Sequence, residues 1–217
     1  MEETLSGPTL VQRAIRSTLL PVASAVPVPH RVALGLLLRD NALELQRDGW
    51  GRLWDIGEAP RYAVVRDFCE RFGGDAHAIL DVGCAQGILQ CDLHYGTYTG
   101  IDLSDDAIAR AQPRADAHTT FDVADAATYT PARPYDVIVF NECLYYLRDP
   151  VGVAQRYLEH LTPGGVIVIS MFDRMWAMRR LLRRLHVLGP VAAHAQVANG
   201  DGARWTVRVH RPTTSPA

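Results

Sequence analysis

The chain lacks the features that would direct it into or across a membrane. No apolar run reaches the length that spans a bilayer, and the longest candidate, residues 32–38, is bracketed by Arg31 and Arg39. Glu2 and Glu3 stand where a signal peptide would carry basic residues. We therefore expect a cytoplasmic protein that has no membrane partner.

Paired cysteines, excess charge and metal-ligand patterns are also absent from the sequence. The four cysteines, Cys69, Cys84, Cys91 and Cys143, form no C-x-x-C pair, which indicates reduced thiols rather than a disulfide framework or a zinc site. The formal net charge is −2, so there is no global basic field for nucleic acid. No Glu/His cluster has metal-ligand spacing, and we therefore expect no metal requirement.

The alternation of apolar runs predicts an α/β protein. A length of 217 residues suits one domain with an appendage. Strands are expected at residues 79–82, 97–103, 135–140, 166–170, 191–198 and 203–209, with a further strand leading into 121–126. Helices are expected at residues 9–20, 30–47, 59–72, 107–112, 151–161 and 173–188, and from Gly87 to about residue 94. We divide the chain into an N-terminal cap (1–58), a core (59–211) and a short tail (212–217).

The stretch from Ala78 to Asp102 carries the clearest functional signal. A buried run at 79–82 ends in Gly83, and Gly87 follows four residues later. A backbone that approaches a ligand closely needs residues without bulk, and this loop supplies Gly83, Cys84, Ala85 and Gly87. An acidic side chain at the end of the next strand can accept both hydroxyls of a ribose. These features predict a pocket for a cofactor that contains a nucleoside.

The loop that begins at Asp81 reads D-x-G-x-x-x-G and resembles motif I of the class I S-adenosylmethionine (SAM)-dependent methyltransferases. It departs from that family at Ala85, where members often carry glycine. Three further motifs resemble the family in the same order: Gly-Ile-Asp-Leu-Ser at 100–104, Asp-Ala at 125–126 and Leu-x-Pro-Gly-Gly at 161–165. The resemblance covers about residues 59–211. It implies a Rossmann-like, seven-stranded mixed sheet with a C-terminal antiparallel hairpin. It also implies that the N-terminal segment is a helical lid, and a simple structural cap stays open as the alternative.

The resemblance also implies SAM as cofactor, S-adenosylhomocysteine (SAH) as product, and a set of cofactor contacts. The glycine loop would wrap the methionine half, Asp102 would hold the ribose, and Asp125 with Ala126 would meet the adenine. Arg61 is a candidate clamp for the methionine carboxylate. The complete candidate set is Arg61, Tyr62, Asp81, Gly83, Cys84, Ala85, Gln86, Gly87, Asp102, Leu103, Asp125, Ala126 and Asn141. Two alternatives stay open: Asp125 as a turn-capping residue, and Arg61 as a solvated arginine at a helix start.

Candidate catalytic residues follow the apolar strand at 135–140. Glu142 should point toward the reacting centre, where it would act as a general base or as a substrate anchor. The alternative is a capping carboxylate for the turn at 143–147. Tyr145 and Tyr146 are candidates for framing the sulfonium or the substrate, or for core packing. His30 is a second catalytic candidate, because a lid would carry it toward the site.

Together these observations predict SAM-dependent methyl transfer to an oxygen or nitrogen atom of a small molecule. The Glu-x-Leu-Tyr-Tyr-Leu run at 142–147 resembles the NodS-type amino-sugar N-methyltransferases. The Trp-x-Val-x-Val-x-Arg-Pro run at 205–212 resembles small methyltransferases of saccharide and natural-product pathways, so we expect an acceptor of that kind. Two alternatives remain: an NAD-type oxidoreductase, disfavoured by the missing third glycine and the hairpin, and a SAM-binding methyltransferase fold with a non-methylating role.

Overall fold

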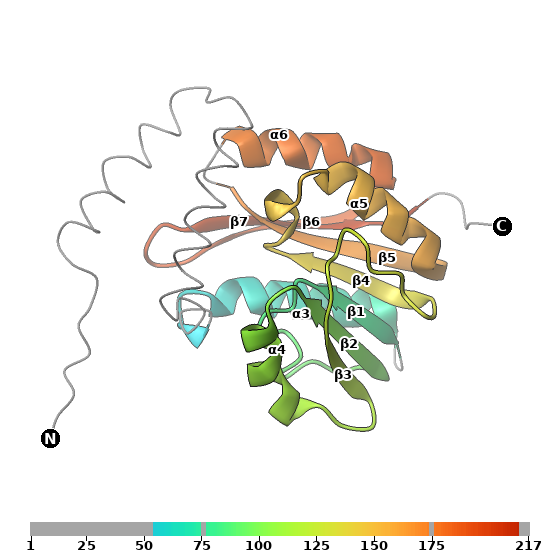
Figure 1. Ribbon diagram of the computed structural model, residues 1–217. Coiled ribbons are helices and arrows are strands. Elements are labelled where there is room, and N and C mark those ends of the chain that lie inside the picture. The colour runs from blue at the N-terminus through green and yellow to red at the C-terminus, as the bar shows by residue number, and fades with distance from the viewer. Residues whose placement is uncertain (1–53, 75–76, 174–175, 213–217) are drawn as a thin grey trace, which may run out of the picture.

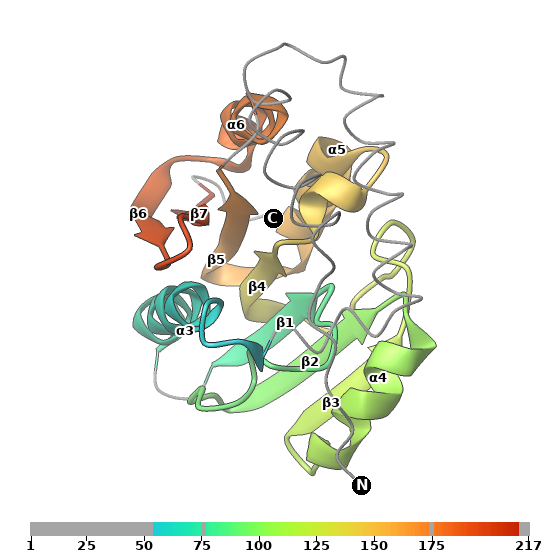
Figure 2. The same ribbon diagram turned by 90° about the vertical axis from the view of Figure 1, so that its left-hand side faces the viewer.

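The computed structural model describes residues 54–74, 77–173 and 176–212 and contains a seven-stranded mixed sheet with helices on both faces (Figures 1 and 2). The strands are β1 (Ala78–Val82), β2 (Thr97–Asp102), β3 (Thr119–Val123), β4 (Tyr135–Asn141), β5 (Leu161–Phe172), β6 (Val191–Ala198) and β7 (Arg204–His210). The helices are α3 (Ala59–Gly73), α4 (Asp105–Ala111), α5 (Pro150–Arg156) and α6 (Trp176–Arg184). Short 3₁₀ turns lie at η2 (Gln112–Arg114), η3 (Leu144–Tyr146), η4 (Tyr157–His160) and η5 (Leu185–Leu188).

The strand order, β3-β2-β1-β4-β5-β7-β6, places β1 at a reversal of the chain's direction across the sheet. From β1 the chain builds outward through β2 and β3, and it then returns to place β4 on the other side of β1. All five of these strands up to β5 run parallel, so their carboxyl ends lie along one edge. Ligands of such sheets bind at this edge, where the strand order reverses.

The predicted C-terminal hairpin is confirmed. Strand β7 runs antiparallel to both β5 and β6 and lies between them. The turn joining the two hairpin strands is fixed by Asn199, whose Oδ1 accepts hydrogen bonds from Asp201 N at 3.0 Å and Ala203 N at 2.9 Å. Such self-capping is why asparagine is frequent in turns.

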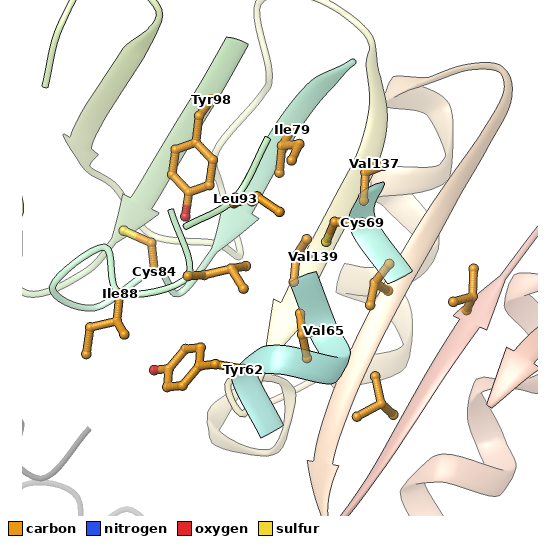
Figure 3. Close-up of a cluster of buried hydrophobic side chains, with 14 of the residues drawn as sticks. Tyr62, Val65, Cys69, Ile79, Cys84, Ile88, Leu93, Tyr98, Val137 and Val139 are labelled. Atoms are coloured by element: carbon orange, nitrogen blue, oxygen red, sulfur yellow. The ribbon is translucent and has the colours of Figure 1, made fainter. Parts of the chain in front are cut away.

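Alternation along the central strands divides the core between the two faces of the sheet. Ile79, Val137 and Val139 belong to the cluster that packs against α3, and Figure 3 shows them beside Val65 of that helix. The intervening residues, such as Ile138, belong to the cluster that packs against α5 and α6. Strands buried on both faces read as continuous apolar runs, and burying each such side chain contributes about 1.5–3 kcal/mol.

The helix expected directly after Gly87 is wrong: residues 85–92 form a series of turns. Gly87 has φ +70° and Asp92 has φ +58°, so left-handed residues bracket only residues 88–91. Four residues cannot propagate a ladder of i→i−4 hydrogen bonds. The side chain of Arg66, on α3, instead binds this segment, donating to Leu89 O at 3.1 Å and to Ile88 O at 2.7 Å.

Other helical predictions match the structure closely where it describes the chain. Ser104 caps α4 as expected, with its Oγ accepting a hydrogen bond from Ala107 N at 3.2 Å. The helices expected at 9–20 and 30–47 lie outside the described residues, as does His30, so the lid stays a prediction. Within the part of the chain that the structure describes, no helix is both long enough and apolar enough to cross a bilayer.

Candidate active site

The glycine loop at the end of β1 is held by its own backbone. Gly83 N and Cys84 N both donate to Ile101 O on β2, at 2.8 and 2.9 Å. Gly83 has φ +75°, and a Cβ placed on it would lie 2.6 Å from the Cβ of Cys143. The position therefore requires glycine for two reasons, a left-handed backbone and a close neighbour. The loop that the sequence predicted is confirmed as a tight turn at the carboxyl edge.

Asp102 receives two backbone N–H groups of the same edge. Ala85 N donates to its Oδ2 at 2.8 Å, and Ser104 N donates to its Oδ1 at 2.9 Å. Burial raises the pKa of Asp102, and the hydrogen bonds from Ser104 and Ala85 oppose this. A carboxylate offers about four acceptor positions, and the backbone of Leu103 takes a third, so Asp102 keeps at least one for a ribose hydroxyl. Ala85 itself has φ +48°, a conformation that costs about 1–2 kcal/mol outside glycine.

Asp81, on β1, is the most deeply buried acid beneath the loop. Its Oδ2 accepts a hydrogen bond from the hydroxyl of Tyr98 at 2.5 Å. Among the described residues its Oδ1 has no hydrogen-bond partner. Burial raises the pKa of Asp81 to about 7, although the Tyr98 hydrogen bond and the charge of Arg61 lower it. An unpaired buried carboxylate oxygen is costly, which agrees with the raised pKa of Asp81.

Arg61, at the start of α3, is buried rather than solvated: its side chain is 1% exposed. Its guanidinium pairs with Glu58, with Nη2 at 2.9 Å and Nε at 3.2 Å from Oε2, and it donates through Nη1 to Asn141 Oδ1. It also lies 4.3 Å from the ring centroid of Tyr62. Glu58, Asn141 and Tyr62 thus take most of the five N–H donors of the guanidinium. Arg61 therefore holds Asn141 and Tyr62 together, and its contact with the cofactor stays a prediction.

Glu142 follows β4 with a left-handed backbone, φ +63°. Its Oε2 accepts from the hydroxyl of Tyr145 at 2.8 Å, and its Oε1 accepts from Ser170 Oγ at 3.2 Å. Burial raises the pKa of Glu142, while Arg61 and both hydroxyl hydrogen bonds lower it. The ring of Tyr145 lies 4.5 Å from that of Tyr146. The structure therefore directs the Tyr145 hydroxyl at Glu142.

The proposed adenine end lies beyond β2 and β3. Leu103 is 72% exposed and Val123 is 55% exposed, so two apolar side chains stand open at neighbouring strand ends. Asp125 Oδ1 accepts a hydrogen bond from Ala127 N at 2.8 Å, which is the turn-capping contact left open above. Ala126 O accepts from side chains of the α5–η4 segment. Capping occupies one oxygen of Asp125, so the other stays available to an exocyclic amine.

Gln86 connects the loop to the segment before α3, a contact that sequence reasoning missed. Trp54 Nε1 donates to Gln86 Oε1 at 3.0 Å, and Arg114 donates to the Gln86 backbone oxygen. The Arg114 guanidinium lies 5.6 Å from the Trp54 ring centroid. Gln86 is therefore a structural anchor of the loop through its side chain. Trp54 in a Gly-rich stretch was the available signal, but the neighbouring sequence does not indicate its hydrogen-bond partner.

Three further contributors were also missed: Ser170, Glu58 and Tyr98. Each is a polar residue beside or within a buried element, and Ser170 interrupts the apolar strand β5. A hydroxyl buried in a strand needs a hydrogen-bond partner, which is the signal that was available for Ser170. In residues 54–74, 77–173 and 176–212, no group of three or more His, Cys, Asp or Glu side chains could hold a metal ion.

Comparison with known proteins places this arrangement in a family. A family model described as a methyltransferase domain matches residues 57–208. The trans-aconitate 2-methyltransferase of Methylobacterium radiotolerans is 33% identical over 129 residues, which cover 57% of this chain and 48% of that protein. The chain thus spans about half the length of the curated relatives it matches.

Solved structures of methyltransferases have the same fold as this chain. N-methyltransferase NodS from Bradyrhizobium japonicum WM9, in complex with SAH, is 25% identical with a TM-score of 0.64, covering 75% of this chain and 91% of that chain. The 1,6-didemethyltoxoflavin-N1-methyltransferase of Burkholderia thailandensis, with bound 1,6-didemethyltoxoflavin and SAH, has a TM-score of 0.64 at 20% identity, covering 87% and 92% respectively. The second comparison shows the fold alone.

The parallel strands, the glycine loop and the acid after β2 define a nucleoside-binding α/β fold. The chain belongs to the methyltransferase-domain family, whose model matches most of its length. The expected class I fold and the family's SAM cofactor are thereby confirmed. The match also favours this family over the oxidoreductase alternative.

Proposed function

We propose that this chain transfers the methyl group of SAM to an amine nitrogen or a hydroxyl oxygen of a small molecule. The observation that carries the proposal is the partly buried carboxylate of Glu142 beside the glycine loop. The next residue, Cys143, donates its thiol hydrogen to Val82 O at 2.9 Å and packs against Gly83. The candidate catalytic carboxylate and the cofactor loop are therefore built into one edge.

The described residues fit the cofactor. Asp102 keeps an acceptor position for the ribose, and Asp81 Oδ1 has no hydrogen-bond partner among the described residues. Both positions support the binding of the polar groups of SAM, and Arg61 stays the predicted partner of the methionine carboxylate. When bound, SAM supplies a methyl group already activated by the sulfonium. The chain's own task is then to orient the acceptor and to take its proton.

Charge selects the class of acceptor. A partly buried anionic side chain such as Glu142 attracts an ammonium or a hydroxyl donor and repels a carboxylate. Arg61, which could offset that repulsion, already donates to Glu58 and Asn141. We therefore place amino or hydroxyl acceptors first, and the likeness to the N-methyltransferase NodS supports an amine nitrogen among them. The resemblance of residues 142–147 to amino-sugar N-methyltransferases supports a saccharide-containing or other natural-product intermediate.

Methylation of a carboxylate oxygen is the second candidate. It is favoured by the likeness to trans-aconitate 2-methyltransferases, which covers 57% of this chain. Because a tricarboxylate would meet Glu142 unfavourably, the two candidates make opposite predictions for the Glu142→Gln variant. Removing the charge should impair transfer to an amine and leave or improve transfer to a carboxylate.

A panel assay tests the proposal. SAH release is measured with SAM and separate acceptors: amino sugars, hydroxylated glycosides, phenols and trans-aconitate, each with wild type and Glu142→Gln. SAH formation with an amine or hydroxyl acceptor, reduced by the substitution, supports the proposal. SAH binding in a thermal-shift experiment without transfer to any acceptor would support the non-methylating alternative. Stabilisation by NADH but not by SAH would overturn the cofactor assignment for this chain.

A further inference from the structure

Glu142 is held on both of its carboxylate oxygens by residues outside the glycine loop. Ser170 Oγ, on β5, donates to Oε1 at 3.2 Å, and the Tyr145 hydroxyl, on η3, donates to Oε2 at 2.8 Å. Ser170 also accepts the Glu142 backbone N–H through its carbonyl oxygen, at 3.1 Å. Two side-chain contacts and one backbone contact thus fix Glu142 relative to a central strand.

The local backbone shows that this arrangement is not a relaxed turn. Glu142 has φ +63°, which costs about 1–2 kcal/mol for a residue with a Cβ. Ser170 is 1% exposed between Ile169 and Met171, which are both fully buried. A hydroxyl in such a strand is unfavourable unless it has a partner, and the Ser170 hydroxyl donates to Glu142. The strained backbone of Glu142 and the buried hydroxyl of Ser170 thus meet at one carboxylate. Backbone strain is often found at functional sites.

We propose that Tyr145 and Ser170 are positioning residues that hold the Glu142 carboxylate in one orientation, with one acceptor position on each oxygen left for the N–H or O–H of the acceptor. This inference rests on the proposed function and deepens it. It changes the predicted role of Tyr145 from framing the substrate to orienting the carboxylate. Ser170 enters the site as a residue that no motif indicated.

The charged and titratable groups that act on Glu142 come from several elements. Arg61 on α3 and the hydroxyl donors Tyr145 and Ser170 favour the ionised carboxylate, whereas burial and the nearby Glu58 favour the protonated form. Without either hydroxyl, fewer interactions stabilise the ionised carboxylate against the effects of burial and of Glu58. The pKa of Glu142 should therefore rise in Tyr145→Phe and in Ser170→Ala, and the two increases should combine in the double variant.

Direct titration of Glu142 tests the inference without any acceptor. The chain contains seven glutamates, so ¹³C-labelled glutamate carboxyl signals can be followed by NMR, and the signal lost in Glu142→Gln identifies Glu142. We expect its titration midpoint to rise by roughly half a pH unit to one unit in each variant, the equivalent of one ordinary hydrogen bond. Tyr135→Phe is the matched control, because it removes a buried tyrosine hydroxyl bonded to Thr99 Oγ1 at 3.1 Å, away from Glu142.

An unchanged Glu142 midpoint in Tyr145→Phe and Ser170→Ala, with Tyr135→Phe also unchanged, would overturn the inference, even if both variants were less stable. Should Ser170→Ala fail to fold, Tyr145→Phe alone decides, and Ser170→Thr, which restores a hydroxyl, should restore the wild-type midpoint. Once an acceptor is found, the acid limb of kcat/KM should move by the same amount as the NMR midpoint. Absence of methylation with a shifted midpoint would contradict the proposed function but keep the positioning role.

Discussion

The two halves of the carboxyl edge hold their acidic groups by different means. At the ends of β1 and β2, Asp102 is bound by backbone N–H groups of Ala85 and Ser104. At the end of β4, Glu142 is bound by the side chains of Tyr145 and Ser170. A backbone donor stays in place on substitution to any residue but proline, whereas side-chain donors can be removed singly. Ordinary substitutions can therefore release Glu142, but they leave the donors to Asp102 in place.

The largest expected effect is on the side-chain-held half. Arg61→Gln removes the buried cation that faces Glu58, Asn141 and Glu142, and breaking a buried ion pair typically costs about 3–5 kcal/mol. We expect the free energy of unfolding in urea to fall by about 3 kcal/mol, toward the low end of that range because Glu58 is partly exposed. Arg71→Gln, which breaks an exposed pair with Asp67, is the control, and equal losses in both variants would contradict a buried network.

Gly83→Ala should destabilise the part of the edge in which backbone N–H groups hold the acidic residue. The added Cβ would meet Cys143 at 2.6 Å and would occupy a left-handed conformation, so strain and overpacking together should cost about 2–4 kcal/mol. Gly164→Ala separates the two causes, because Gly164 has φ +86° with no heavy atom near its missing Cβ. Denaturant unfolding should show a larger loss at Gly83 than at Gly164. Similar losses at both positions would mean that the contact with Cys143 relaxes freely.

Asp102→Asn tests the same half through binding. An asparagine retains shape but replaces one acceptor oxygen by an NH₂ group and removes the charge that is proposed to receive the ribose. Losing charge-assisted hydrogen bonds costs about 1.5–3 kcal/mol, so calorimetry should show SAH affinity reduced at least tenfold. Asp105→Asn, an exposed change in the first turn of α4, should leave the affinity unaltered. Unchanged affinity in Asp102→Asn would move the ribose contact elsewhere.

The remaining prediction concerns pH and Asp81. The folded pKa is about 7 and the ordinary value is 3.8, so the folded protein binds more protons between these two values. The contribution of Asp81 is fully present below pH 3.8 and is lost as pH rises through 7, at no more than about 1.4 kcal/mol per pH unit. The unfolding free energies of wild type and Asp81→Asn are compared from pH 4 to 8. Within that window the wild type should lose stability relative to Asp81→Asn as pH rises. Parallel curves would show that Asp81 does not titrate there.

The contrast between local backbone contacts and long-range side-chain contacts also explains which parts of the site could be predicted from the sequence. The glycine loop, Asp102, the Ser104 cap and the hairpin depend on neighbours a few residues away or on adjoining motifs, and all were predicted. The bonds from Arg61 to Asn141 and from Ser170 to Glu142 join residues 80 and 28 positions apart. Their partners become visible only once the strand order is known. The turns at 85–92 were misread because apolar spacing alone does not show left-handed residues.

The bonds of Arg66 to the 85–92 segment have a consequence for local unfolding. The carbonyl groups of Ile88 and Leu89 are bound to α3, where a regular helix would bind its own amides. Opening this segment therefore also requires detaching it from the helix that carries Arg61, so the two belong to one cooperative unit. A ligand that binds only when the glycine loop is folded therefore also raises the free energy that is needed to open α3.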